Sequence, residues 1–262
     1  MTITEQKEFL SGYTGETECP VDFAARWQSA VCALDPKVSL RPLDLGNPNG
    51  IYETMTVVSG GKTLRARVLR PAAPGTYPLL LLFHDLNRGV RGWHHMTRYL
   101  AFGYGVVAPE GVPFQEDWQA NPEKVDFQGR YLDALTVAKA ALTLPWVEKG
   151  KTVAFGEGFG GGLALLCGAM LPKVRCAALN PFPGDFRGMG KAGFDHVDLA
   201  NFAQLCRSEV LLGTCLMDSY APPAGQAAIY NRLTCKKEWK RYPKYVHERV
   251  NFFENQLLYF LR

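Results

Sequence analysis

The sequence predicts an α/β fold in which a mostly parallel β-sheet is flanked by helices on both faces. From residue 51 onward, short apolar or β-branched segments alternate with longer helix-like segments, the pattern of strand and crossover helix. Residues 51–58 and 63–69 instead alternate polar and apolar positions around Ser59-Gly60-Gly61, which predicts an antiparallel hairpin at the N-terminal edge of the sheet. We expect residues 1–262 to form one domain.

The elements follow in order after a proline-bounded loop at residues 71–78. Buried parallel strands are expected as short, nearly continuous apolar runs, and we predict them at residues 79–84, 105–109, 152–155, 175–179, 209–216 and 238–242. Helices are predicted between and after them at residues 93–102, 129–142, 161–171, 225–233 and 247–261.

The first 50 residues have a different character. Residues 22–34 have an amphipathic helix pattern, and residues 35–49 are rich in proline, asparagine and glycine, which predicts a loop. A helix this short rarely folds alone, so we expect residues 1–50 to pack as a helix and loop on the outside of the main domain.

Composition excludes several classes of function. Hydrophobic residues make up 47% and charged residues 21% of the chain, as in ordinary globular proteins. The net charge is only +4, and the cluster Lys236, Lys237, Lys240 and Arg241 is interrupted by Glu238 and Trp239, so we interpret it as a solvated strand edge and expect no nucleic-acid partner.

The N-terminal residues and the cysteines indicate the compartment in which the protein works. The N-terminal residues lack the apolar core of an export signal, and no apolar stretch reaches membrane-spanning length, so we expect no membrane association. Seven cysteines with no Cys-x-x-Cys pair suggest neither a zinc site nor a disulfide framework. Together these features favour a cytoplasmic protein with reduced thiols.

A glycine-rich turn between a strand and a helix is the most informative motif. Gly156-Glu157-Gly158-Phe159-Gly160 has the form of the Gly-x-Ser-x-Gly nucleophile elbow of α/β-hydrolases, with Gly158 in place of the serine. In that fold the nucleophile is followed along the chain by an acid and then a histidine. Asp218 ends an apolar strand, and His247 follows the strand-like residues 238–242.

We therefore assign Asp218 and His247 as the acid and base of a triad whose nucleophile position, Gly158, is empty. Each has a plain alternative: Asp218 could cap the helix after Pro222, and a single histidine at a helix start is commonly structural. Their joint occurrence in the expected order favours the triad assignment.

These motifs resemble the acetyl xylan esterase and cephalosporin C deacetylase family of α/β-hydrolases. The family's Gly-Gly-Ser-Gln-Gly-Gly-Gly elbow is similar to residues 156–162, and its Gly-Leu-Met-Asp acid motif is similar to residues 215–218. Its Tyr-Pro-x-x-x-His-Glu motif is similar to residues 242–248, and weaker similarities extend over nearly the whole chain. The resemblance implies an α/β-hydrolase fold and an acetylated carbohydrate ligand.

The chain departs from the family at two motifs. Glycine replaces the elbow serine, and Asp85-Leu86-Asn87 stands where the family has Gly-Tyr-Asn in its oxyanion loop, so the tyrosine is missing. The backbone N–H groups of Leu86 and Phe159 can still form an oxyanion hole. Segments after Pro109 and Arg187 are shorter than in family members, where they help to build the pocket and a ring-shaped oligomer, so a homo-oligomer is an open expectation.

Three functions remain open, because loss of a triad nucleophile costs roughly a million-fold in turnover. The first is a pseudoenzyme that binds a small acylated carbohydrate or related molecule. The second is an acetyl ester hydrolase in which His247 and Asp218 activate water. The third is a different histidine-based chemistry, or a role for Glu157, which we interpret more simply as a solvent-facing residue or a cap of the following helix.

No cofactor or metal is expected. His94 and His95 are adjacent on a predicted helix and face different directions, so they do not share a metal with His84. The glycine-rich turn lacks the lysine and the serine or threonine of a phosphate-binding loop.

Overall fold

The computed structural model describes residues 2–262, which contain a single nine-stranded sheet in the order β1-β2-β3-β5-β4-β6-β7-β8-β9. The first three strands are antiparallel, and β4 to β9 run parallel to one another, which confirms the predicted fold class. The strands are β1 (Lys37–Leu43), β2 (Gly50–Ser59), β3 (Lys62–Pro71), β4 (Tyr77–Phe83), β5 (Gly105–Glu110), β6 (Val147–Glu157), β7 (Val174–Leu179), β8 (Val210–Cys215) and β9 (Lys237–Tyr242).

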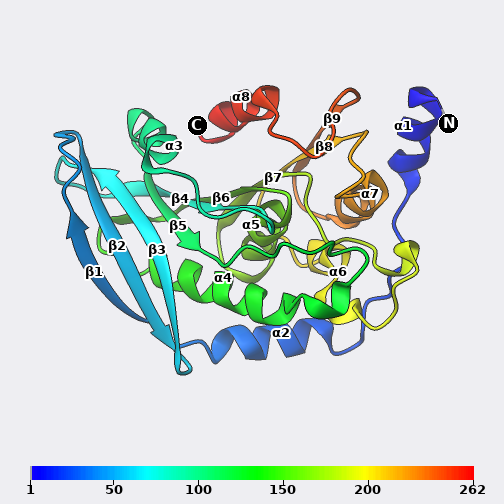
Figure 1. Cartoon of the computed structure of the whole chain (residues 1–262), viewed down its shortest axis with the longest axis horizontal. Helices are drawn as coiled ribbons and strands as arrows, with labels where there is room; N and C mark the ends of the chain where they lie inside the picture. Colours follow the sequence, from blue (N-terminus) through cyan, green and yellow to red (C-terminus); the bar gives the residue numbers. More distant parts are fainter. Residues whose placement is uncertain (1) are drawn as a thin grey trace.

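Helices cover both faces of this sheet (Figure 1). On one face lie α4 to α7, with α2 packed outside α4, and on the other lie α3 and α8. The helices are α1 (Ile3–Gly12), α2 (Phe23–Cys32), α3 (Trp93–Thr97), α4 (Phe127–Ala141), α5 (Phe159–Met170), α6 (Leu199–Ala203), α7 (Pro223–Arg232) and α8 (Asn251–Phe260).

Packing on both faces of the sheet explains why the sequence of β4 is one continuous apolar run. Leu79, Leu81 and Phe83 pack in the cluster under α4 and α5, whereas Leu80 and Leu82 pack in the cluster under α3 and α8. A strand buried on both faces has no polar side to alternate. The same two-sided burial extends along β7 and β8.

Two expectations about local structure are wrong. Lys37–Leu43 forms the edge strand β1, paired with β2, within the segment expected to be a loop. Most of its side chains are exposed, so backbone pairing forms the strand without an apolar pattern. The last helix begins at Asn251, so His247 lies in the loop between β9 and α8 and does not open the helix.

Parallel strands bring the loops that matter to one edge of the sheet. Asp85 follows β4, Gly158 follows β6, Asp218 follows β8, and His247 follows β9. Because these strands run in the same direction, the loops after them converge at the carboxyl edge, where ligands bind in open α/β sheets.

Candidate active site

The elbow turn between β6 and α5 has the backbone of a nucleophile-bearing turn. Gly158 has φ of 59° and ψ of −128°, a conformation that L side chains rarely adopt. Gly160 has no room for a side chain, since a Cβ there would lie 2.6 Å from the carbonyl oxygen of His84. The strand, turn and helix therefore pack as closely as such an elbow requires.

The space beside Gly158 is filled by the side chain of Asp85. A Cβ on Gly158 would lie 2.6 Å from Oδ2 of Asp85 and closer still to its Oδ1 and Cγ atoms. Asp85 belongs to the loop after β4 and is only 6% exposed. Its carboxylate stands where the side chain of an elbow nucleophile would begin.

This carboxylate also accepts hydrogen bonds from both backbone N–H groups that were assigned to the oxyanion hole. The N–H of Leu86 and the N–H of Phe159 each donate to Oδ1 of Asp85 at 2.8 Å. Two buried N–H groups that converge on one oxygen form the arrangement that stabilises an oxyanion. In this structure the protein's own carboxylate occupies that point.

His247 joins Asp85 to Asp218. Its Nδ1–H donates to Oδ2 of Asp218, and its Nε2–H donates to Oδ2 of Asp85, both at 2.7 Å. The Asp218 side chain is fully buried, and its Oδ1 accepts hydrogen bonds from the N–H groups of Tyr220 and Ala221. Asp218 therefore holds its own turn with one oxygen and contacts the histidine with the other. The alternative that it caps the next helix is wrong, because α7 begins at Pro223 and no side chain caps it.

The imidazole between these two carboxylates is held in its charged form. Burial disfavours the charge, but the hydrogen bonds and negative charges of Asp218 and Asp85 outweigh burial and raise the pKa of His247 to about 9. A doubly hydrogen-bonded imidazolium has both of its N–H groups engaged. At neutral pH His247 is therefore a proton donor in the resting state and not a free base.

Aromatic rings enclose the imidazole. The ring of Tyr220 lies 4.6 Å from it, and that of Phe182 lies 6.0 Å away, measured between centroids. The Tyr220 hydroxyl is buried and has no hydrogen-bond partner within residues 2–262. Burial and the negative charge of Asp85 raise the pKa of Tyr220, so its hydroxyl stays protonated.

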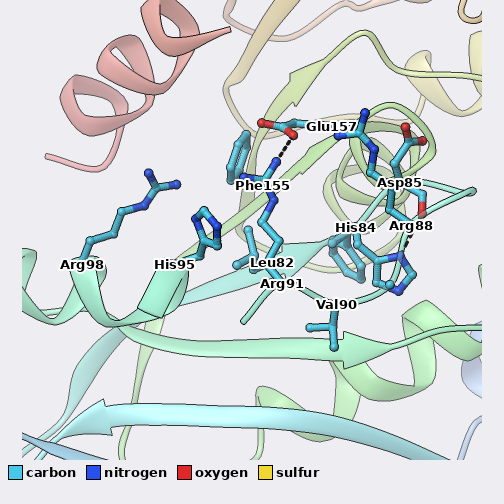
Figure 2. A pocket seen from close by; sticks show the side chains of 12 residues that line it. Leu82, His84, Asp85, Arg88, Val90, Arg91, His95, Arg98, Phe155 and Glu157 are labelled. Carbon is cyan, nitrogen blue, oxygen red and sulfur yellow. Dashed lines mark hydrogen bonds and ion pairs between the residues drawn. The ribbon is translucent and has the colours of Figure 1, made fainter. Parts of the chain in front are cut away.

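Two cavities border Asp85. The smaller, about 40 Å³, also contains Arg88 and an ion pair between Arg91 and Glu157 (Figure 2). The larger, about 610 Å³, lies between the start of β3, the end of β5 and α4, and Leu86 and Phe159 share its wall with Asp85. Its volume suits a small-molecule ligand.

Glu157 differs from its expected role. Its side chain is largely buried and pairs with Arg91, so it is neither a solvent-facing residue nor a cap of α5. Burial raises the pKa of this carboxyl group, which the nearby arginine partly offsets. A charged pair in the small cavity explains why a glutamate is tolerated next to the glycine turn.

The structure brings together all five residues assigned to the site, and their catalytic roles stay predictions. Sequence reasoning missed Tyr220, whose ring lies against His247, and it missed Asp85. A signal for it was present, because the acidic residue replaces the first glycine of the family's Gly-Tyr-Asn loop in the same chain that lacks the elbow serine. The two changes lie far apart in the sequence, and only the fold shows that they meet.

Comparison with known proteins identifies the family. The family model described as Acetyl xylan esterase (AXE1) matches residues 1–113, 114–192 and 190–262, so the chain belongs to this family of α/β-hydrolase fold proteins. Acetyl xylan esterase 1 from Thermoanaerobacterium sp. JW/SL YS485 is 24% identical, with a TM-score of 0.86 over 100% of this chain and 98% of that one.

Other solved structures share the fold at lower identity. The acetyl xylan esterase from Paenibacillus sp. R4 is 19% identical, with a TM-score of 0.86 over 100% of this chain and 99% of that one. A cold-adapted esterase from an Arctic intertidal metagenomic library is 16% identical, with a TM-score of 0.65 over 85% and 98% of the two chains.

Residues 2–262 contain neither a cluster of metal ligands nor a membrane-spanning helix. Among these residues no group of three or more histidine, cysteine, aspartate or glutamate side chains is placed to hold a metal ion. None of the helices described is both long and apolar enough to cross a bilayer.

Proposed function

We propose that this chain is a ligand-binding member of the acetyl xylan esterase family that does not hydrolyse acetyl esters through an acyl-serine intermediate. One observation carries the proposal: the Asp85 carboxylate fills the space beside Gly158 and accepts both Leu86 and Phe159 N–H groups. An acetyl ester would need that space for its carbonyl group and those donors for its oxyanion. The elbow serine is absent and the oxyanion position is occupied.

The ligand that we propose is a small acylated carbohydrate or a related molecule. The cavity of about 610 Å³ has charged side chains such as Arg65 and Arg130 and apolar ones such as Leu163, which suits a ligand with both hydroxyl and acyl groups. Family membership supports the same ligand class.

Hydrolysis by water that His247 activates receives less support from this geometry. A general base must have a free lone pair within reach of the water. Nε2 of His247 instead donates to Asp85, and the raised pKa keeps the ring protonated at neutral pH. We expect the wild-type protein to hydrolyse para-nitrophenyl acetate no faster than the His247→Ala variant does.

Restoring the nucleophile tests the main proposal. Gly158→Ser alone should stay inactive because Asp85 still fills the site, and Asp85→Gly alone should stay inactive because it opens the hole without supplying a nucleophile. The double variant Asp85→Gly/Gly158→Ser should hydrolyse para-nitrophenyl acetate with an initial burst, at least about a thousandfold faster than either single variant. Adding His247→Ala to the double variant should abolish the gain.

Two outcomes would contradict the proposal. Efficient acetyl-ester hydrolysis by the wild-type chain would show that the missing serine is not needed. High activity of Gly158→Ser alone would show that Asp85 does not occlude the site.

Binding is tested separately. Titration with acetylated xylo-oligosaccharides in a calorimeter should show binding without release of acetate. Leu163→Trp, which fills the larger cavity, should weaken binding, whereas Leu205→Trp replaces a half-buried leucine outside that cavity and should not. Equal binding by both variants would show that the ligand does not bind in the larger cavity.

A further inference from the structure

We propose that Asp85 is a carboxylate nucleophile that opens small terminal epoxides, with His247 and Tyr220 handling the protons. This inference rests on the proposed loss of acyl-serine chemistry and adds a reaction that loss alone does not imply. The Asp85–His247–Asp218 chain is continuous, with both links at 2.7 Å. A carboxylate thus stands at the position from which a triad nucleophile acts.

The two oxygens of Asp85 have separate environments. Oδ1 is fixed by the N–H groups of Leu86 and Phe159, whereas Oδ2 contacts only the imidazole among the hydrogen-bond donors of residues 2–262. A carboxylate oxygen has two lone-pair directions, so Oδ2 keeps one for attack. Carboxylates form covalent ester intermediates in this way, and Asp85 borders the cavity that would hold the substrate.

The surrounding donors favour an epoxide over other substrates with a reactive carbon. When the ring of an epoxide opens, its oxygen stays on the product as an alkoxide and needs a proton. His247 is an imidazolium beside Oδ2, and the Tyr220 hydroxyl is buried, protonated and without a partner among the described residues. A departing halide needs no proton and would use neither group.

The reaction balances from this resting state. Oδ2 of Asp85 bonds to the terminal ring carbon as the ring C–O bond breaks, and the electron pair stays on the ring oxygen. Tyr220 donates a hydrogen bond to that oxygen, and Nε2 of His247 supplies the proton. The products of this half are an ester on Asp85 and a neutral imidazole.

Hydrolysis of the ester restores the site. Water gives a proton to Nε2 of His247 while its oxygen adds to the ester carbonyl carbon, and the Leu86 and Phe159 N–H groups hold the charge on Oδ1. The bond between that carbon and Oδ2 then breaks, and the leaving alkoxide takes the proton of the new carboxyl group. The net change is epoxide plus water to diol, with Asp85 ionised and His247 protonated again.

Oxygen labelling of the wild-type protein is the decisive test and needs no variant. Excess protein is incubated with glycidol or styrene oxide in heavy-oxygen water, and the diol and the peptide containing Asp85 are analysed by mass spectrometry. We expect the heavy oxygen in Asp85 and ordinary oxygen in the first-turnover diol. Label in the diol with none in Asp85 would overturn the proposal, as would no diol above the uncatalysed level with both epoxides.

Variants separate the roles. His247→Gln cannot supply the proton or activate water, so it should form the Asp85 adduct slowly and leave that adduct unhydrolysed. Asp85→Asn should form neither adduct nor diol, whereas the exposed Asp44→Asn should behave as wild type. Tyr220→Phe should slow adduct formation about a hundredfold. An adduct elsewhere than Asp85 would overturn the inference. It would leave the rescue of acetyl-ester hydrolysis by Asp85→Gly/Gly158→Ser as an independent test of the proposed function.

Discussion

Asp85 and Gly158 are coupled at the scale of single residues. Each departs from the family's motif, and each departure makes the other possible, because a side chain on Gly158 would overlap the Asp85 carboxylate. The loss of one group and the gain of another in the same volume keep the site filled. The site is therefore better described as rebuilt around a carboxylate than as simply emptied.

A double-mutant cycle measures this coupling. Gly158→Ala should lower the free energy of unfolding by about 2 kcal/mol or more, since alanine is strained at a φ of 59° and collides with Asp85. In the Asp85→Gly background the collision is gone, so the same change should cost less, with a coupling of about 1 kcal/mol or more. Urea unfolding of the wild type, the two single variants and the double variant gives this coupling energy. Strictly additive changes would contradict the contact between Asp85 and a side chain at position 158.

At the scale of elements, a buried aspartate joins the N-terminal segment to the loop after β7. Asp198 accepts four hydrogen bonds, from the N–H groups of Asp185, Phe186 and Ala200 and from the hydroxyl of Thr17. Asp185 in turn accepts from the Tyr13 hydroxyl and from the N–H groups of Glu16 and Thr17. The segment between α1 and α2 is thus held by polar contacts, which the pattern of apolar residues in the sequence does not indicate.

Asp198→Ala should therefore destabilise the protein strongly. It leaves several buried donors without acceptors, and each such group costs about 1 to 3 kcal/mol. Asp198→Asn keeps one oxygen and should cost less. Thermal unfolding ranks the variants, and faster proteolysis within the first 20 residues of the alanine variant would locate the loosened segment. A loss below about 1 kcal/mol for Asp198→Ala would contradict this role.

At the scale of the whole molecule, the site stabilises the fold as well as carrying the proposed chemistry. The pKa of His247 is raised from 6.5 to about 9 on folding, so its ion pairs contribute fully below pH 6.5 and are lost as the pH rises through 9. Burial lowers the pKa of His84 and of His95 on folding, so these two histidines change the free energy of unfolding only below about pH 6.5. The two sets of histidines therefore act in different pH ranges.

The unfolding free energy should fall between pH 6.5 and 9 by on the order of 3 kcal/mol more in the wild type than in His247→Gln. Denaturant unfolding of both proteins at several pH values isolates the histidine, because other groups contribute equally to each. Parallel pH profiles would show that the imidazole is not held between two carboxylates.

The sequence by itself determined the fold class, the elbow, and the order of Gly158, Asp218 and His247. These follow from local patterns: apolar runs buried on both faces of a sheet, a glycine turn between strand and helix, and motifs of contiguous residues. It did not reveal the edge strand β1, which is held by backbone pairing and has few buried side chains.

Only the tertiary structure decided what occupies the candidate active site. Asp85 and Gly158 lie on loops after β4 and β6, and their contact depends on the parallel pairing of those two strands. The charge state of His247 likewise arises from carboxylates contributed by two other loops. Long-range packing sets both properties, because space and electrostatic field depend on neighbours that are distant in the chain.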